Sequence, residues 1–255
     1  MQPDFFIDSE PQTAAAGQHA LVYSTEPQSG VVSTIRGSPL EALFELSLRA
    51  YDTVIHAEMD ESFPQIELEQ YIQKIFDAVR ETEKSLGQHS RQKKSEADIQ
   101  LASRAAAEKA ASDRGDALVR RVCDAAYKVE HEIHRLMGLL RFNPGADNMW
   151  LARCAPDHFI LPCLAEHFMA RFGDDPWAII DEKRGLALVR QRGEDCRFGP
   201  LSAFPFLADG VQMQDNWEDL WRHYHKTIFI ENRKNPGLQR QLMPARYWKY
   251  LPEKH

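Results

Sequence analysis

The residues of this chain best suited to acid–base chemistry are histidines near carboxylates in the sequence. His158 follows Asp157 directly after an expected strand, and an imidazole beside a carboxylate can accept or donate a proton near neutral pH. His134 and Asp181 are its candidate companions, and we predict a catalytic acid–base site built from His134, His158 and Asp181. The structural alternative is that His158 caps a helix or binds a loop carbonyl.

A metal site has little support from the spacing of the histidines. His131 and His134 are three residues apart, whereas helical zinc ligands are typically four apart, and His223 and His225 point in nearly opposite directions on a helix. The four cysteines include no C-x-x-C pair, and the usual motifs of triad hydrolases, nucleotide triphosphatases, Rossmann folds and iron–sulfur proteins are absent. We predict neither a bound metal nor a cofactor.

The strongest electrostatic signal is the basic C-terminal segment. Residues 222–255 contain eight basic and two acidic residues, a net charge of +6, whereas residues 1–100 contain 8 and 17, a net charge of −9. Aromatic residues alternate with these cations, a combination that suits single-stranded or flipped nucleic acid. The predicted nucleic-acid contacts are Arg141, Lys183, Arg184, Arg222, Lys226, Arg233, Lys234, Arg246, Tyr247, Trp248 and Lys249. Alternatively, the aromatic residues pack the tail onto the sheet while the cations are solvated or pair with the acidic region.

A second predicted docking point for phosphate is the turn at residues 181–185. Lys183 and Arg184 lie beside Asp181 there, and backbone amides are free at a turn. The structural alternative is that Asp181 orients Arg184 or closes the turn.

Length and composition fit one or two globular domains, with 255 residues of which 43% are hydrophobic and 27% charged. Apolar runs are only a few residues long, far short of the roughly 18 to 20 that span a bilayer. The first residues lack the basic and apolar regions of a signal peptide. We expect a cytoplasmic protein with reduced thiols and no membrane partner.

Three regions are expected along the chain. Residues 1–19 lack periodicity and predict a mobile arm. Residues 20–113 are acidic and predict a mostly helical region with a short hairpin at residues 20–35. The helices expected in this region are at about 39–52 and 68–86, followed by an exposed helix or helical linker at 88–113.

Residues 114–255 form the third region, in which the periodicity changes from helix to strand. The longest apolar stripe, from Val119 to Leu136, predicts a helix with one buried face. Two hairpins are expected at residues 139–154 and 177–190, with one helix between them and another from Trp217. This α-ββ-α-ββ-α order predicts an α+β fold, with a small antiparallel sheet of two hairpins and helices on one face.

A series of short motifs runs in order through residues 118–253. They include His134-Arg135, Gly138-Leu139-Leu140-Arg141-Phe142, Pro156-Asp157-His158, Leu161-Pro162, Ala165-Glu166-His167-Phe168, Trp177-Ala178-Ile179-Ile180-Asp181, Lys183-Arg184-Gly185, Asn235-Pro236 and Arg246-Tyr247-Trp248. With these motifs the chain resembles the bacterial family of probable DNA metabolism proteins, which is built on a domain of uncharacterised function. Members of that family are typically encoded beside a radical-SAM protein linked to DNA modification or repair, and the domain also occurs fused to a uracil-DNA glycosylase-like domain.

The resemblance implies a role in DNA repair or modification. Our first hypothesis is a protein that binds single-stranded or damaged DNA through its basic aromatic C-terminal region and assists a radical-SAM or uracil-DNA glycosylase-like partner. The second is an enzyme that acts on a damaged base or nucleotide through His158, Asp181 and the arginines. The third is an interaction scaffold without nucleic-acid contact, in which the acidic N-terminal helices form the docking surface.

Overall fold

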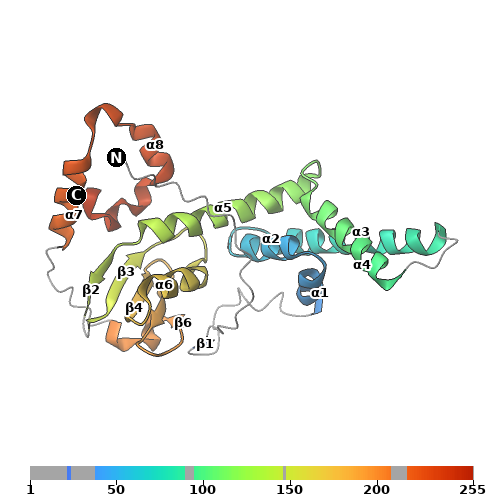
Figure 1. The fold of residues 1–255 in the computed structure, drawn as a ribbon, viewed down its shortest axis with the longest axis horizontal. Helices are drawn as coiled ribbons and strands as arrows, with labels where there is room; N and C mark the ends of the chain where they lie inside the picture. The colour runs from blue at the N-terminus through green and yellow to red at the C-terminus, as the bar shows by residue number, and fades with distance from the viewer. Residues whose placement is uncertain (1–21, 24–37, 90–94, 146–147, 208–216, 255) are drawn as a thin grey trace, which may run out of the picture.

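The computed structural model describes residues 22–23, 38–89, 95–145, 148–207 and 217–254. Within them a group of helices and a β-sheet lie at opposite ends of one long helix, α5 (Ala117–Leu139), and a C-terminal helical segment lies beside the sheet (Figure 1). The expected order of a mostly helical N-terminal region followed by strands and helices is confirmed. The expected arm at residues 1–19 lies outside the described residues.

The N-terminal region contains four helices. They are α1 (Ser38–Leu46), α2 (Leu48–Glu58), α3 (Gln65–His89) and α4 (Glu96–Ser112). The single helix predicted at 39–52 is divided in two because Ser47 has an extended backbone, with φ of −156°, and caps α2. Its hydroxyl accepts a hydrogen bond from the amide of Ala50 at 3.0 Å and donates one to Glu108 of α4 at 2.6 Å.

Helix α4 packs along α3 and is not a bare linker. Its N-terminus is fixed by a capping box, in which the side chains of Ser95 and Asp98 each accept a hydrogen bond from the backbone amide of the other residue. Small residues on its inner face, Ser103, Ala107 and Ala111, are buried. Side chains this short allow α4 to lie close to its neighbour, so a helix with a weak apolar stripe still contributes to the core.

Helix α5 belongs to two cores, which confirms the long stripe predicted from Val119 to Leu136. Val119 and Val122 pack with α1 to α4, whereas Ile133 and Leu136 pack on the sheet. Asp116 caps the helix by accepting hydrogen bonds from the amides of its first turn. One continuous helix therefore connects the helical region and the sheet.

The sheet has six strands in the order β1-β6-β5-β4-β3-β2. They are β1 (Val22–Tyr23), β2 (Phe142–Pro144), β3 (Trp150–Cys154), β4 (Trp177–Asp181), β5 (Leu186–Arg190) and β6 (Arg197–Pro200). The two predicted hairpins are confirmed as β2–β3 and β4–β5. Of the hairpin expected at residues 20–35, only β1 is described, and it pairs with β6.

The prediction of a purely antiparallel sheet was wrong, because β3 runs parallel to β4 and β1 parallel to β6. The chain leaves the end of β3, passes through η2 (Leu161–Leu164) and α6 (Ala165–Phe172), and returns to the start of β4. A helical crossover of this kind makes the two joined strands parallel. The α+β class is confirmed, with a mixed sheet.

The two faces of the sheet are covered differently. Alternate residues such as Ala152 and Ile179 face α5 and α6, whereas Leu151 and Ile180 face the opposite side. That second face is covered by two short turns, η3 (Leu201–Ala203) and η4 (Pro205–Leu207), around the buried Phe204. The α-helices that pack on the sheet thus lie on one face, as predicted.

The C-terminal segment consists of α7 (Trp217–Ile228), η5 (Glu231–Arg233), α8 (Pro236–Leu242), η6 (Ala245–Tyr250) and η7 (Pro252–Lys254). The predicted C-terminal helix is confirmed as α7, which lies against η7. Leu220, Tyr224 and Ile228 on its apolar side are exposed. Among the residues described, no helix combines the length and the apolar character of a membrane span.

Candidate functional site

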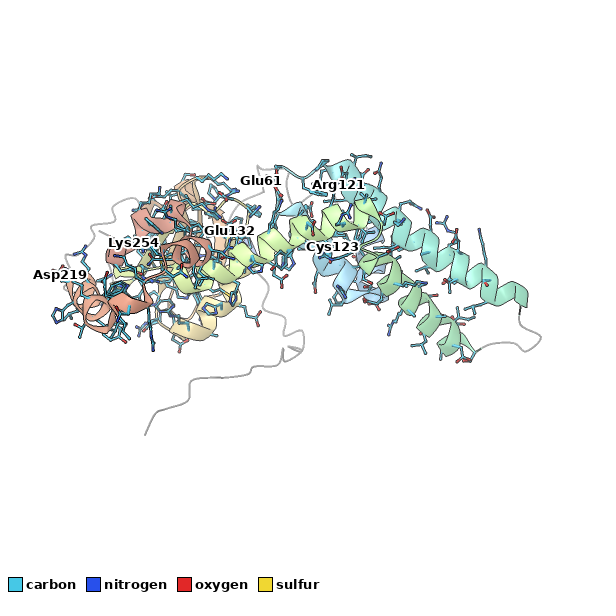
Figure 2. All side chains as sticks on the ribbon, turned by 90° about the horizontal axis from the view of Figure 1, so that it is seen from above. Glu61, Arg121, Cys123, Glu132, Asp219 and Lys254 are labelled. Atoms are coloured by element: carbon cyan, nitrogen blue, oxygen red, sulfur yellow. The ribbon has the colours of Figure 1, made fainter. Side chains whose placement is uncertain are left out.

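The first candidate site is centred on Glu132, a buried carboxylate on the half of α5 that packs on the sheet. Glu132 is 1% exposed, and Figure 2 shows it well along α5 from Arg121 and Cys123 at the helical end. It accepts hydrogen bonds from the amides of Asp157 and His158, each at 2.9 Å, and from the hydroxyl of Tyr247. A charge in this position is tolerated only because it is so completely paired.

These hydrogen bonds keep Glu132 ionised. Burial by itself raises the pKa of Glu132, but the bonds from His158, Tyr247 and the two backbone amides outweigh burial and lower that pKa to about 2. The pKa of Tyr247 is raised by burial and by its bond to this carboxylate, so its hydroxyl stays a donor. Arg246 adds a longer contact to Glu132, at 3.5 Å.

The ionised carboxylate also orients His158. Nδ1 of His158 lies 2.5 Å from Oε2 of Glu132, and because that oxygen can only accept, Nδ1 is the protonated nitrogen. The second nitrogen, Nε2, is then the group through which the ring can exchange a proton. An imidazole fixed by a carboxylate in this way is a common general base.

A second buried carboxylate, Asp181, lies at the end of β4 and is held by a cation. It accepts hydrogen bonds from the amide of Lys183 at 2.9 Å and from the guanidinium of Arg184 at 3.0 Å. The positive φ of Gly185 closes the turn that follows. The structural alternative for this turn is therefore confirmed, since Asp181 both orients Arg184 and closes the turn.

The loop at residues 156–158 joins the two buried carboxylates. Its amides donate to Glu132, while its carbonyl groups accept from Arg184 and from the ammonium group of Lys183. The loop follows β3, and Asp181 ends the parallel neighbour β4. Ligands of open sheets tend to bind at the carboxyl ends of parallel strands, where this network lies.

The same network fastens the helical region to the sheet. Arg184 is only 10% exposed on its side chain and pairs with Glu61, which follows α2. The amide of Phe159 donates to the carbonyl of Met59 at 3.0 Å. Arg184 is thus committed to internal contacts and is not free to bind phosphate, contrary to the prediction from the sequence.

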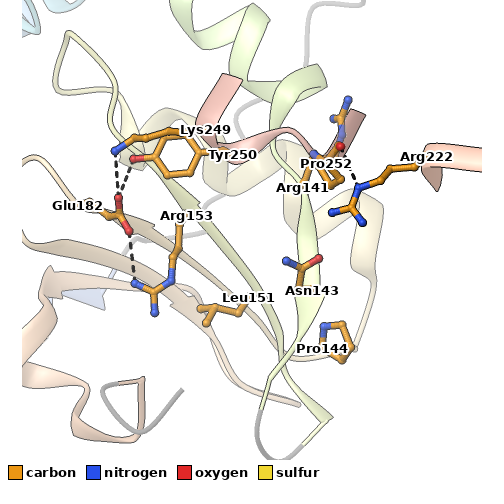
Figure 3. Close-up of a pocket in the computed structure, with 10 residues that line it drawn as sticks. All are labelled: Arg141, Asn143, Pro144, Leu151, Arg153, Glu182, Arg222, Lys249, Tyr250 and Pro252. Atoms are coloured by element: carbon orange, nitrogen blue, oxygen red, sulfur yellow. Dashed lines mark hydrogen bonds and ion pairs between the residues drawn. The ribbon is translucent and has the colours of Figure 1, made fainter. Parts of the chain in front are cut away.

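The second candidate site is a cationic cavity of about 400 Å³ at the β2–β3 edge of the sheet. Figure 3 shows the C-terminal segment along one side of it and the strands along the other. Its lining residues are Arg141, Asn143, Pro144, Leu151, Arg153, Glu182, Arg222, Lys249, Tyr250 and Pro252. Four cations and one carboxylate therefore surround one space, although they come from distant parts of the sequence.

Two of the four cations of the cavity are held by short contacts with neighbouring acceptors. Arg141 pairs with Glu253 at 2.7 Å, and Arg222 donates to the carbonyl of Pro252 at 3.1 Å. Glu182 receives a hydrogen bond from Tyr250 at 2.7 Å, which is the main reason that the pKa of Glu182 is lowered. Hydrogen bonds and ion pairs thus fix Arg141, Arg222 and Tyr250 in the lining.

The predicted residues are distributed over several places. His158 and Asp181 belong to one hydrogen-bonded network, but His134 is exposed on α5, about 200° around the helix from Glu132. Tyr247 is 1% exposed, so its ring cannot stack on a base. Arg246 pairs with Asp157 at 3.0 Å beside the network.

The remaining predicted contacts divide into the cavity and the outer surface. Arg141, Arg222 and Lys249 line the cavity. The exposed group consists of Lys226, Arg233 and Lys234 on α7, η5 and the residue after it, and of Lys183, whose ammonium group bonds the loop carbonyl. Trp248 is half-buried, and its indole donates to the carbonyl of Met243 at 2.9 Å.

Two important residues were missed from the sequence. Glu132 lies within the buried stripe of α5, and an acidic residue at such a position signals a paired, functional or structural charge. Arg153 gave a weaker signal, as a charged residue within an expected strand. In the structure it lies on the face of β3 that points away from α5 and α6. Neither signal identifies the residue that pairs with the charge. Tyr247, for example, donates to Glu132 from more than a hundred residues further along the chain.

Metal ligation has no geometric basis in the described part of the chain, where no three His, Cys, Asp or Glu side chains are arranged to hold an ion. The thiols of Cys123, Cys154, Cys163 and Cys196 are all free. The described side chains of the two sites are hydrogen-bonding, acid–base and cationic groups.

Fold and sites together define an α+β protein with a paired carboxylate and imidazole at one end of a mixed sheet and a cationic cavity at its edge. A family model described as a domain of unknown function, DUF4130, matches residues 93–253. The match covers more than half of the chain, including α4, α5, strands β2 to β6 and the C-terminal segment, so the chain belongs to this family. The comparisons of this chain with curated proteins and with solved structures found no match.

Proposed function

We propose that this protein acts in DNA repair or modification by binding single-stranded or damaged DNA through its C-terminal segment. The observation that supports this most directly is the joint exposure of cations and rings on α7, on η5 and on the residue that follows each. Lys226, Arg233 and Lys234 are exposed, as are the rings of Tyr224 and Phe229. Cations attract phosphates and exposed rings stack on unpaired bases. The context of DNA repair rests on the resemblance of the C-terminal half to the DNA metabolism family.

The test is the salt dependence of binding to a fluorescently labelled single strand. We expect the variant K226Q/R233Q/K234Q to bind more weakly than the native protein. The slope of log affinity against log salt concentration falls by about 0.7 for each phosphate that the protein no longer neutralises, so the slope of the triple variant should fall by up to about 2. Fluorescence anisotropy at several salt concentrations measures both quantities.

A matched control is the variant R80Q/K84Q/R104Q, which removes three exposed cations from α3 and α4. It has the same change in net charge but should retain the native affinity and slope. Equal weakening by both triple variants, or no binding of the strand at low salt, would contradict the proposal.

A second candidate function, an enzyme acting on a damaged base or nucleotide, is supported by one observation. Glu132 fixes Nδ1 of His158 and so prepares Nε2 to take a proton from water or substrate. Mass spectrometry of strands containing uracil or hypoxanthine, incubated with the protein, tests for base loss or conversion. Activity that disappears in H158Q supports this function, whereas unchanged strands support binding alone.

A partner protein and a cytoplasmic location complete the proposal. The exposed apolar side chains of α7 and α8, among them Ile228 and Leu242, favour contact with another protein, and we propose a radical-SAM or uracil-DNA glycosylase-like one. Four free thiols favour a reducing compartment. Sedimentation of the purified protein with and without a purified candidate partner tests the first point.

A further inference from the structure

We propose that the cationic cavity at the β2–β3 edge binds a nucleoside 5′-monophosphate group, as a free nucleotide or as the phosphorylated end of a DNA strand. The strand-end form rests on the nucleic-acid function proposed above, whereas the free-nucleotide form does not. The argument has two parts, one for the phosphate and one for the base. The residues that carry the two parts alternate around the cavity, with Tyr250 beside Lys249, Leu151 beside Arg153 and Pro252 beside Arg222 (Figure 3).

The charge of the lining favours a phosphate. Four cations and one carboxylate face the cavity, and an excess of one positive charge remains even when the carboxylates of Glu253 and Asp219 are counted as partners of Arg141 and Arg222. Arginine presents parallel N–H groups that match two oxygens of a phosphate. Guanidinium groups converge here from β3, α7 and the residue before β2.

Two of the cations in the cavity have only long ion pairs with their carboxylate partner. Arg153 and Lys249 share the single carboxylate of Glu182, at 3.5 and 3.4 Å, whereas a good N–H···O bond measures roughly 2.7 to 3.2 Å. A phosphate oxygen would give Arg153 and Lys249 the short, charged bonds that they lack.

The apolar and aromatic residues of the lining favour a planar ring. Pro144, Leu151 and Pro252 provide apolar surface, and the ring of Tyr250 is held by the hydrogen bond from its hydroxyl to Glu182. The volume of about 400 Å³ lies within the range of small-molecule sites. A lining that holds both cationic and apolar residues suits a phosphate joined to a base better than either group alone.

Calorimetric titration of the full chain in phosphate-free buffer at low salt tests the proposal. We expect dTMP and dAMP to bind, and thymidine and inorganic phosphate to bind at least tenfold more weakly. R153Q should weaken dTMP binding by roughly tenfold or more, because a charge-assisted bond is removed. This variant should fold normally, since Arg153 is 39% exposed on its side chain and makes one long ion pair.

Two further variants sharpen the test. E182Q removes the carboxylate that competes with the phosphate while keeping an acceptor for Tyr250, so dTMP should bind several-fold more tightly. R192Q is the matched control, because Arg192 is exposed, pairs with Asp175 at 3.6 Å and does not line the cavity. R192Q should bind dTMP as the native protein does.

The two sources of the group are separated with strands that carry a 5′-phosphate or a 5′-hydroxyl. A preference for the phosphorylated strand that R153Q abolishes supports the strand end, whereas binding of dTMP without such a preference supports the free nucleotide. No binding of dTMP, equal binding to native protein and R153Q, or inorganic phosphate binding as tightly as dTMP overturns the proposal. If strands still bind through Lys226, Arg233 and Lys234 in that case, the proposed function stands; if they do not, it fails as well.

Discussion

Nδ1 of His158 lies 2.5 Å from the buried carboxylate of Glu132, although the two residues are 26 positions apart in the sequence. Glu132 lies on α5, whereas His158 lies in the loop after β3. Glu132 also accepts a hydrogen bond from the hydroxyl of Tyr247, in the C-terminal segment. One buried charge thus joins α5, the loop after β3 and the C-terminal segment. Changes at this point should therefore affect stability more than any exposed charge does.

The first prediction concerns acid sensitivity. The pKa of Glu132 falls from its ordinary value of 4.5 to about 2 in the folded state, so its contribution is fully present above pH 4.5 and is lost as the pH falls toward 2. The shift corresponds to about 3 kcal/mol of the free energy of unfolding. E132Q should be less stable by about this amount at pH 7 and should lack this part of the pH dependence.

Urea unfolding at a series of pH values measures the effect. E130Q serves as control, because Glu130 is exposed on the same helix. The interpretation fails if E130Q and E132Q show the same stability at pH 7 and the same loss toward pH 2.

The second prediction concerns the phenol that donates to this carboxylate. Y247F keeps the buried ring but removes the hydrogen bond, and a bond to a charged group contributes about 2 kcal/mol. The variant should lose that much stability at pH 7 and begin to unfold at a higher pH than the native protein, because the pKa of Glu132 rises. Y224F, which alters an exposed ring, should leave both properties unchanged.

The third prediction is an asymmetry between the two ends of one ion pair. R184Q leaves Asp181 buried without its cation, so it should cost about 3 kcal/mol or more. E61Q removes the more exposed partner and should cost less than about 1 kcal/mol. Thermal and urea unfolding of both variants measure the difference. Equal costs would show that Arg184 acts mainly as a surface residue.

The fourth prediction concerns the order in which the thiols react. Burial raises the pKa of all four, to about 11 for Cys163 and about 12 for Cys196. Since only the thiolate is nucleophilic, an alkylating reagent at pH 8 should modify the native protein slowly, with Cys123 and Cys163 before the buried Cys154 and Cys196. Mass spectrometry of peptides gives the order, and all four should react at similar rates in urea. Faster reaction of Cys154 in the folded state would contradict the structure.

The sequence by itself determined most of the local elements. The stripe from Val119 to Leu136 identified α5, and the alternating segments at 139–154 and 177–190 identified both hairpins. These patterns are readable because helical and strand periodicities arise between residues a few positions apart. The turn that divides α1 from α2 at Ser47, and strand β6 in the connector, were not distinguished by such patterns.

Only the tertiary structure decided the direction of the strands and the use of the charges. The crossover through α6 made β3 and β4 parallel, and packing turned Arg184 and Tyr247 inward while Arg141, Arg153 and Arg222 came to surround one cavity. Composition located the basic residues at the C-terminus but could not show which of them would be paired. Pairing depends on which distant segments meet in the folded chain, and no periodicity within a single segment encodes that.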